Sequence, residues 1–220
     1  MTALRFRTIV FDLDGTLADT VPDIAAALNH GLAQVGRHIL MLDAVRRMVG
    51  HGGKVLVERG LAATGGTDEL TLATAYAAMI AYYETHVCVH SEPYPGAAAA
   101  LDVLRDRGVA LAVCTNKPEH LARGLIDMLG WTDRFAAIVG GSTLAATKPD
   151  PAMLHLAIDQ AGGGPAAMVG DSIVDVQTAR AVGVPCVAVS FGYPDRPVDQ
   201  LGADAVIDRF DDLLPALSRL

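Results

Sequence analysis

The chain has 220 residues, of which 51% are hydrophobic and 19% charged, a composition that suits a folded protein and excludes a disordered one. Its net charge of −8 argues against nucleic acid as the main partner, because a phosphate backbone needs a basic surface. No apolar stretch approaches the roughly 18 residues that a membrane-spanning helix needs. We therefore expect a cytoplasmic protein, monomeric or dimeric, with neither a nucleic-acid nor a membrane partner.

Short apolar strands alternate with helical patterns along most of the chain. The strands are apolar on both faces, which is typical of a parallel sheet that helices cover on both sides. The sequence therefore predicts an α/β fold with a doubly wound parallel sheet. The expected strands are 7–12, 109–114, 136–140, 166–170, 185–190 and 204–207, and the expected helices between them are 97–107, 119–129, 150–161, 173–182 and 210–219.

Residues 22–86 differ from the rest because they carry helical patterns only. Pro22 suits the first turn of a helix, and a cluster of proline and glycine at 93–96 indicates the return to the sheet. We therefore expect an all-helical unit inserted after the first strand. The expected division is an α/β core of residues 1–17 and 91–220 and a helical cap of residues 18–90, whose later helices cover 42–49, 54–63 and 68–86.

Two acidic residues, Asp12 and Asp14, follow the first strand directly. Ligands of open α/β sheets bind beyond the carboxyl ends of the strands, and strand alternation places these two side chains on the same side. Two carboxylates so close repel each other unless a cation or a proton intervenes. One interpretation is a turn or helix cap. The other, which we favour, is a metal-assisted nucleophile with an acid/base partner.

More polar residues stand at the ends of later strands or at helix starts. Thr115 and Asn116 offer a hydroxyl, an amide and backbone N–H groups that suit phosphoryl oxygens, although a simple turn would look the same. Asp171 and Asp175 are four residues apart, which places both on one helical face if the helix begins promptly. Lys148 precedes a helix and, taken alone, is an ordinary surface lysine.

Four segments, taken together and in this order, resemble the motifs of the haloacid dehalogenase superfamily of phosphotransferases. The first is Phe-Asp-Leu-Asp-Gly-Thr-Leu at 11–17, and the second is Thr115-Asn116. The third is Lys148-Pro149, and the fourth is Gly-Asp-Ser-Ile-Val-Asp at 170–175. The resemblance covers essentially the whole chain, and the helical insertion resembles the cap of the family's helical-cap subgroup.

This resemblance implies a phosphomonoester hydrolase that acts on a small phosphorylated metabolite through an aspartyl-phosphate intermediate. It implies Mg²⁺ as the cofactor, and an all-oxygen site is what Mg²⁺ prefers. The implied roles are Asp12 as nucleophile, Asp14 as acid/base, and Thr115, Asn116 and Lys148 as phosphate-binding residues. The implied metal ligands are Asp12, Asp171 and the Asp14 carbonyl. Asp175 would contact these ligands, or the metal through a water, without binding the metal directly.

The cap contains a glycine-rich loop between two predicted helices, which alone could be an ordinary helix–helix turn. Its pattern resembles the cap loop of the phosphoglycolate phosphatase subfamily, but it departs from that pattern at 51–54. The resemblance implies 2-phosphoglycolate as substrate. We expect the loop to bind the substrate carboxylate through backbone N–H groups, with charge from Lys54 or His51. The expected loop residues are Gly50, His51, Gly52 and Lys54.

Other functions stay open at this point. A phosphonoacetaldehyde hydrolase would need a cap lysine for a Schiff base, and Lys54 is the candidate. A sugar-phosphate phosphatase of the same superfamily is also open. A sugar-phosphate mutase would need a cap that re-presents a bisphosphate intermediate, and no motif here requires one. A phospho-acceptor signalling domain also uses an acidic cluster and a lysine on a doubly wound sheet. Such a domain has no need of a long helical insertion or of the second acid, Asp14.

Overall fold

A six-stranded parallel sheet forms the centre of the α/β part in the computed structural model, which describes residues 4–220. The strand order is β5-β4-β1-β6-β7-β8, so that β1 lies between β4 and β6. In register, Phe11 at the end of β1 is opposite Val113 and Val169. All six expected strands are present: β1 (Thr8–Phe11), β4 (Ala110–Cys114), β5 (Ala137–Val139), β6 (Ala166–Gly170), β7 (Cys186–Val189) and β8 (Ala205–Ile207).

Helices cover both faces of this sheet because successive strand residues point to opposite sides. On β1, Ile9 and Phe11 pack into one core, whereas Val10 packs into the other. The first core contains α5 (Ala97–Asp106), α6 (Glu119–Met128) and α9 (Leu213–Leu217), and the second contains α7 (Pro151–Gln160) and α8 (Ile173–Val182). The last helix is shorter than expected, because its first turn is the 3₁₀ segment Phe210–Asp212.

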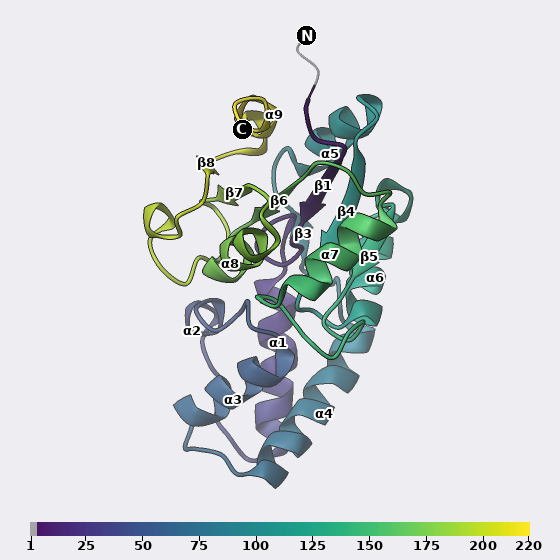
Figure 1. Ribbon diagram of the computed structural model, residues 1–220. Coiled ribbons are helices and arrows are strands. Elements are labelled where there is room, and N and C mark those ends of the chain that lie inside the picture. The colour runs from purple at the N-terminus through teal and green to yellow at the C-terminus, as the bar shows by residue number, and fades with distance from the viewer. Residues whose placement is uncertain (1–3) are drawn as a thin grey trace.

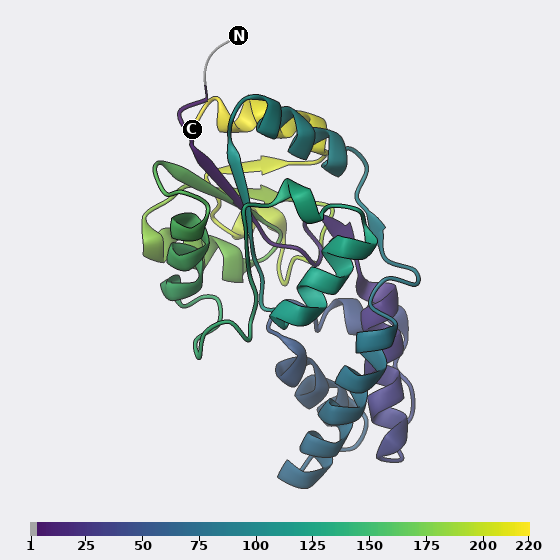
Figure 2. The same ribbon diagram turned by 90° about the vertical axis from the view of Figure 1, so that its right-hand side faces the viewer.

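Four helices form a separate group at the end of the molecule far from both termini (Figures 1 and 2). The first and last of them lie close together at Gly31, where an added Cβ would come within 2.5 Å of the Ala75 carbonyl oxygen. Across residues 4–220, we find no helix with the length and apolar character to cross a membrane. The four helices are α1 (Val21–Gln34), α2 (Leu42–Arg46), α3 (Gly53–Ala63) and α4 (Glu69–Thr85).

The two chain segments that join this helical group to the sheet pair with each other. β2 (Ala18–Asp19) and β3 (Glu92–Pro93) form a short antiparallel ladder. The expectation of an all-helical stretch starting at residue 18 is therefore wrong for its first two residues. A strand of two residues is too short to show the alternation by which strands are recognised in a sequence.

Asp23, in the first turn of α1, also stabilises the junction between the helical group and the sheet. Its side chain is buried, and its carboxylate accepts hydrogen bonds from the backbone N–H groups of Val89, His90 and Ser91 at 2.8–3.0 Å. The Ser91 hydroxyl donates a further bond at 2.7 Å. One buried charge therefore satisfies several donors of the segment that leads back to the sheet.

We expect Asp23→Ala to lower the free energy of unfolding by about 2–4 kcal/mol, because it removes several charge-assisted hydrogen bonds and leaves their donors unpaired. Urea denaturation measures this change. The control is Asp159→Ala on α7, whose side chain is exposed and whose loss should change stability by less than about 0.5 kcal/mol. Equal effects of the two substitutions would contradict the anchoring role of Asp23.

Candidate active site

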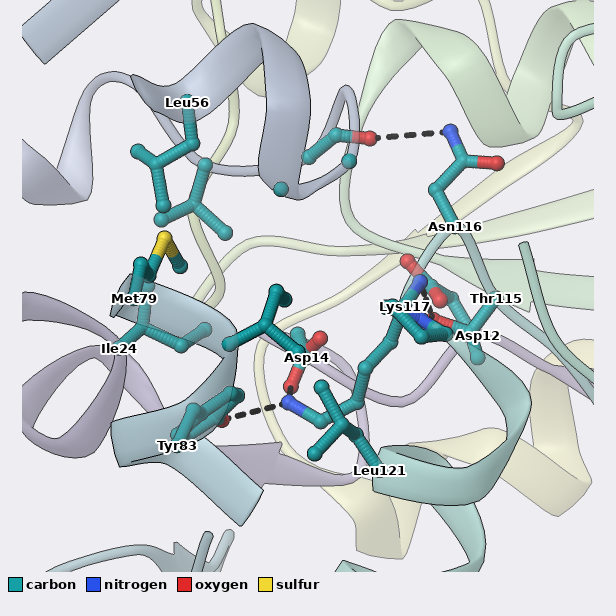
Figure 3. A pocket seen from close by; sticks show the side chains of 16 residues that line it. Asp12, Asp14, Ile24, Leu56, Met79, Tyr83, Thr115, Asn116, Lys117 and Leu121 are labelled. Atoms are coloured by element: carbon teal, nitrogen blue, oxygen red, sulfur yellow. Dashed lines mark hydrogen bonds and ion pairs between the residues drawn. The ribbon is translucent and has the colours of Figure 1, made fainter. Parts of the chain in front are cut away.

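The carboxyl ends of neighbouring strands bring the predicted site residues together. Asp12 follows β1, Thr115 follows β4 and Asp171 follows β6. A pocket between this edge of the sheet and the helical group is lined by Asp12, Asp14, Thr115 and Asn116 (Figure 3). The same pocket is lined on its other side by residues of α1, α3 and α4, so both parts of the chain contribute to it.

Asp12 is almost fully buried at the floor of this pocket. Its Oδ1 accepts hydrogen bonds from the Leu13 backbone N–H at 2.7 Å and forms an ion pair with Lys148 Nζ at 3.0 Å. Burial raises the pKa of Asp12 to about 6. Lys148 opposes this shift, while Asp175 and Asp14 add to it. No hydrogen bond from residues 4–220 reaches its Oδ2, which is therefore available to a ligand.

Asp12, Asp171 and Asp175 form a buried cluster in which one carboxylate oxygen from each lies within 4.8 Å of the others. Burial, followed by the charges of Asp175 and Asp12, raises the pKa of Asp171 well above its usual value. An all-oxygen cluster of this kind can hold a hard divalent cation, which would offset the mutual repulsion of the carboxylates.

The two later acids of the cluster differ in how their oxygens are used. Asp175 accepts four hydrogen bonds, from Lys148 Nζ, the Asp171 and Ser172 backbone N–H groups and the Ser172 hydroxyl. Asp171 accepts two, from the Thr16 hydroxyl and the Tyr193 backbone N–H. A carboxylate has about four acceptor sites, so Asp171 keeps more of them for a ligand than Asp175, whose Oδ2 accepts three bonds and whose Oδ1 pairs with Lys148. Asp171 and Asp175 do not lie on one helical face as expected, because α8 begins at Ile173, after Asp171.

Lys148 is buried, and its ammonium group lies between Asp12 and Asp175. Burial disfavours its charge, but these two carboxylates prevail and raise its pKa. The Asn116 amide holds the backbone of Lys148 from both sides, accepting from its N–H at 2.9 Å and donating to its carbonyl at 3.1 Å. Asn116 also donates to the carbonyl of Gly50 at 3.3 Å. Its side chain thus positions other groups, and its role in phosphate binding stays a prediction.

Asp14 lies at the edge of the pocket and is paired with a cation that the sequence analysis missed. Its Oδ1 accepts from the Thr20 hydroxyl at 2.7 Å and from Lys117 Nζ at 2.9 Å. Lys117 also donates to the Tyr83 hydroxyl at 2.6 Å, and its ammonium lies between the two groups in Figure 3. The available signal was that Lys117 stands two residues after Thr115.

The structure brings only part of the expected cap loop into this pocket. Gly50 and Gly52 line it, together with Gly53. Lys54 is exposed and, like His51, lines a neighbouring groove instead. Burial, followed by the charge of Arg59, lowers the pKa of His51 and so disfavours its cationic form. The binding of substrate by the Lys54 and His51 side chains stays a prediction.

Tyr193 is a second residue that the sequence analysis missed. Its backbone N–H donates to Asp171 Oδ2 at 2.7 Å, and its hydroxyl donates to Asp19 at 2.6 Å. The same hydroxyl accepts from the Thr20 backbone N–H at 2.7 Å. The preceding residue, Gly192, has no room for a side chain, because an added Cβ would lie 2.2 Å from the Gly15 carbonyl oxygen.

Comparisons with known proteins agree with this geometry. The family model of haloacid dehalogenase-like hydrolases matches residues 6–183. A phosphoglycolate phosphatase of Rhodospirillum rubrum is 45% identical over 94% of this chain and 89% of its own. One from Mesorhizobium japonicum is 45% identical over 96% and 94%. The crystal structure of a predicted phosphoglycolate phosphatase from Haemophilus somnus superposes with a TM-score of 0.90 at 30% identity, covering 96% of this chain and 97% of that one.

The chain belongs to the haloacid dehalogenase-like hydrolases. Within that family it is an enzyme of the phosphoric monoester hydrolase class. The α/β fold and the motif resemblance expected from the sequence are thereby confirmed.

We expect Gly192→Ala to displace Asp171, since the added Cβ would lie 2.4 Å from the Asp171 Cβ. Overpacking of this kind costs about 1–3 kcal/mol of stability, and the moved carboxylate should lower phosphatase kcat/KM at least about tenfold. The matched control is Gly124→Ala on α6, where the new Cβ meets Val87 at an ordinary 3.7 Å. If both variants keep full activity and an unchanged melting temperature, the close packing around Asp171 is not needed for activity or stability.

Proposed function

We propose that this enzyme hydrolyses 2-phosphoglycolate to glycolate and inorganic phosphate, with Mg²⁺ as cofactor and an aspartyl-phosphate intermediate on Asp12. The observation that carries the proposal is that Asp12 and Asp14 line one pocket, while Lys148 and Asp171 lie directly beside Asp12. Relatives that are 45% identical over most of the chain bear the name phosphoglycolate phosphatase, which supports the choice of substrate.

The residues present fit a magnesium ion. Asp12 and Asp171 supply buried carboxylate oxygens. Among residues 4–220, Asp12 Oδ2 has no hydrogen-bond donor, and each oxygen of Asp171 has one. The backbone carbonyl of Asp14 completes the proposed set of ligands. When bound, the ion supplies positive charge to the phosphoryl oxygens and orients them for attack. Asp175 takes no direct part in this set, because its Oδ2 accepts three hydrogen bonds and its Oδ1 is paired with Lys148.

The proposed reaction has two displacements at phosphorus. In the first, a carboxylate oxygen of Asp12 forms a bond to phosphorus while the bond to the glycolate oxygen breaks, and Asp14 gives its proton to that leaving oxygen. In the second, water attacks the phosphorus of the aspartyl-phosphate and Asp14 takes its proton. The bond between phosphorus and Asp12 then breaks and releases phosphate. Lys148 balances the charge that develops on the phosphoryl oxygens, and the Thr115 hydroxyl donates a hydrogen bond to them.

The helical group supplies the part of the pocket that surrounds the rest of the substrate. Its walls there are apolar, with Ile24, Leu56 and Met79 among them, and they offer few partners for the hydroxyl groups of a sugar. We propose that residues 18–90 act as a cap over a catalytic core of 1–17 and 91–220. The lysine that a phosphonoacetaldehyde hydrolase would need, Lys54, is exposed and outside this pocket.

A turnover screen tests the substrate. In the presence of Mg²⁺, 2-phosphoglycolate should have the highest kcat/KM in a panel that includes glucose phosphates, phosphoserine and phosphonoacetaldehyde. Phosphate release measures turnover of the esters, and acetaldehyde release measures cleavage of the phosphonate. If a sugar phosphate has the highest kcat/KM, the proposed substrate is wrong. If the enzyme cleaves phosphonoacetaldehyde and borohydride traps a lysine adduct, the proposed reaction is wrong.

Substitution of the two acids tests the mechanism. Asp12→Asn should abolish phosphate release, whereas Asp14→Asn should slow it by roughly 10²–10⁴-fold, the usual worth of general acid/base catalysis. Acid quenching during turnover should trap phosphate on the unaltered enzyme but not on Asp12→Asn. Asp43→Asn, an exposed acid in the first turn of α2, is the control and should keep full activity. Near-normal turnover by purified Asp12→Asn would refute the assignment.

Metal binding should depend on pH through Asp12. Because its pKa rises from 3.8 to about 6 on folding, the metal-free protein gains stability from protonation of this group. That gain is present below the unfolded value and is lost as the pH rises through about 6. Mg²⁺ binds the ionised form, so it should raise the melting temperature more at about pH 7.5 than at about pH 5. An equal shift at both pH values, measured by thermal unfolding, would contradict the proposed ligand set.

A further inference from the structure

Lys117 is the only cationic side chain among the 16 residues that line the pocket. It stands on the loop after β4, and its side chain reaches toward α4, on the side of the pocket that the apolar residues Ile24, Met79 and Leu121 also line (Figure 3). The side chain is buried, and its Nζ lies 4.5 Å from the centre of the Tyr83 ring. A single buried positive charge therefore faces a cavity whose other walls are mostly uncharged.

The hydrogen bonds of Lys117 leave room for a ligand. An ammonium group has three N–H donors, and within residues 4–220 only two acceptors are in reach, Asp14 Oδ1 and the Tyr83 hydroxyl. The Tyr83 hydroxyl accepts from Lys117, and none of the described residues accepts its own hydrogen. Two donors from different parts of the chain are thus available side by side at the pocket wall.

The other basic residues near the pocket are less suited to hold a second anion. Lys148 is enclosed between Asp12 and Asp175, so its charge acts where the phosphoryl group of the substrate would bind. Lys54 is exposed and lines the neighbouring groove. Lys117, on the core side, is the lysine that lines the pocket itself.

We propose that Lys117, assisted by the Tyr83 hydroxyl, is the residue that determines specificity by binding a second anionic group of the substrate. This inference rests on the proposed function and names its substrate class: short phosphomonoesters that carry a carboxylate a few bonds from the phosphoryl group. A neutral group at that position can accept a hydrogen bond from the ammonium but lacks the opposite charge, so it binds more weakly than a carboxylate. The apolar side of the pocket disfavours long polyhydroxylated substrates in addition.

The experiment compares an acid with its neutral isostere. We measure kcat/KM for 2-phosphoglycolate and for 2-phosphoglycolamide, in which an amide replaces the carboxylate, and take their ratio. Lys117→Met removes the charge and keeps the length of the side chain. It should lower the ratio by about 10- to 100-fold, the usual worth of a charge-assisted hydrogen bond. Arg107→Met, which removes an exposed cation directly after α5, is the control and should leave the ratio within about twofold.

A merely structural lysine would change the turnover of both compounds and leave their ratio unaltered, which would overturn the inference. The same conclusion follows if the unaltered enzyme does not discriminate acid from amide. If Lys117→Met fails to fold by circular dichroism, Tyr83→Phe serves instead, and it should lower the ratio by about 3- to 30-fold. If another carboxylated phosphomonoester proves the better substrate, the proposed function fails, and the ratio for that compound and its amide still tests Lys117.

Discussion

Lys148 places one buried ammonium group between the carboxylates of Asp12 and Asp175, at a point where acidic side chains alone would repel each other. Removing such a charge from a buried pair leaves its partners uncompensated, which is far more costly than the loss of a surface ion pair. The rest of the site is arranged around this contact. Asn116 holds the Lys148 backbone from both sides, and Asp175 in turn accepts from the backbone N–H groups of Asp171 and Ser172, just before α8.

The order of the strands explains how the acids reach this lysine. β1 lies in the middle of the sheet, and its neighbours β4 and β6 come from parts of the chain about 100 and 160 residues away. Parallel pairing puts the carboxyl ends of all three at one edge. Each strand therefore delivers its polar residues to the same place, and the intervening helices bury the apolar faces that hold the strands in register.

Much of this arrangement could be predicted from the sequence, since a strand buried on both faces has a recognisable composition and Asp12, Thr115 and Asp171 follow such strands directly. The position of Lys117 two residues after Thr115 could have drawn attention to it, but its contacts could not be predicted, because its partners Asp14 and Tyr83 are distant in sequence. Tyr193 acts on Asp171 through a backbone N–H, which leaves no mark in a pattern of side chains. Lys54 was predicted to bind substrate from its position beside the glycines; its side chain is exposed in the first turn of α3, and this role stays a prediction.

The contact between Asn116 and Gly50 joins a side chain of the core to a backbone carbonyl of the helical group. Because the accepting atom belongs to the main chain, substitution of neighbouring loop side chains does not remove it. The loop can therefore change its chemistry during evolution while the distance between it and the catalytic floor is kept. In a family whose members differ in substrate, such a contact lets the side chains that line the pocket change while the shape of the pocket is kept.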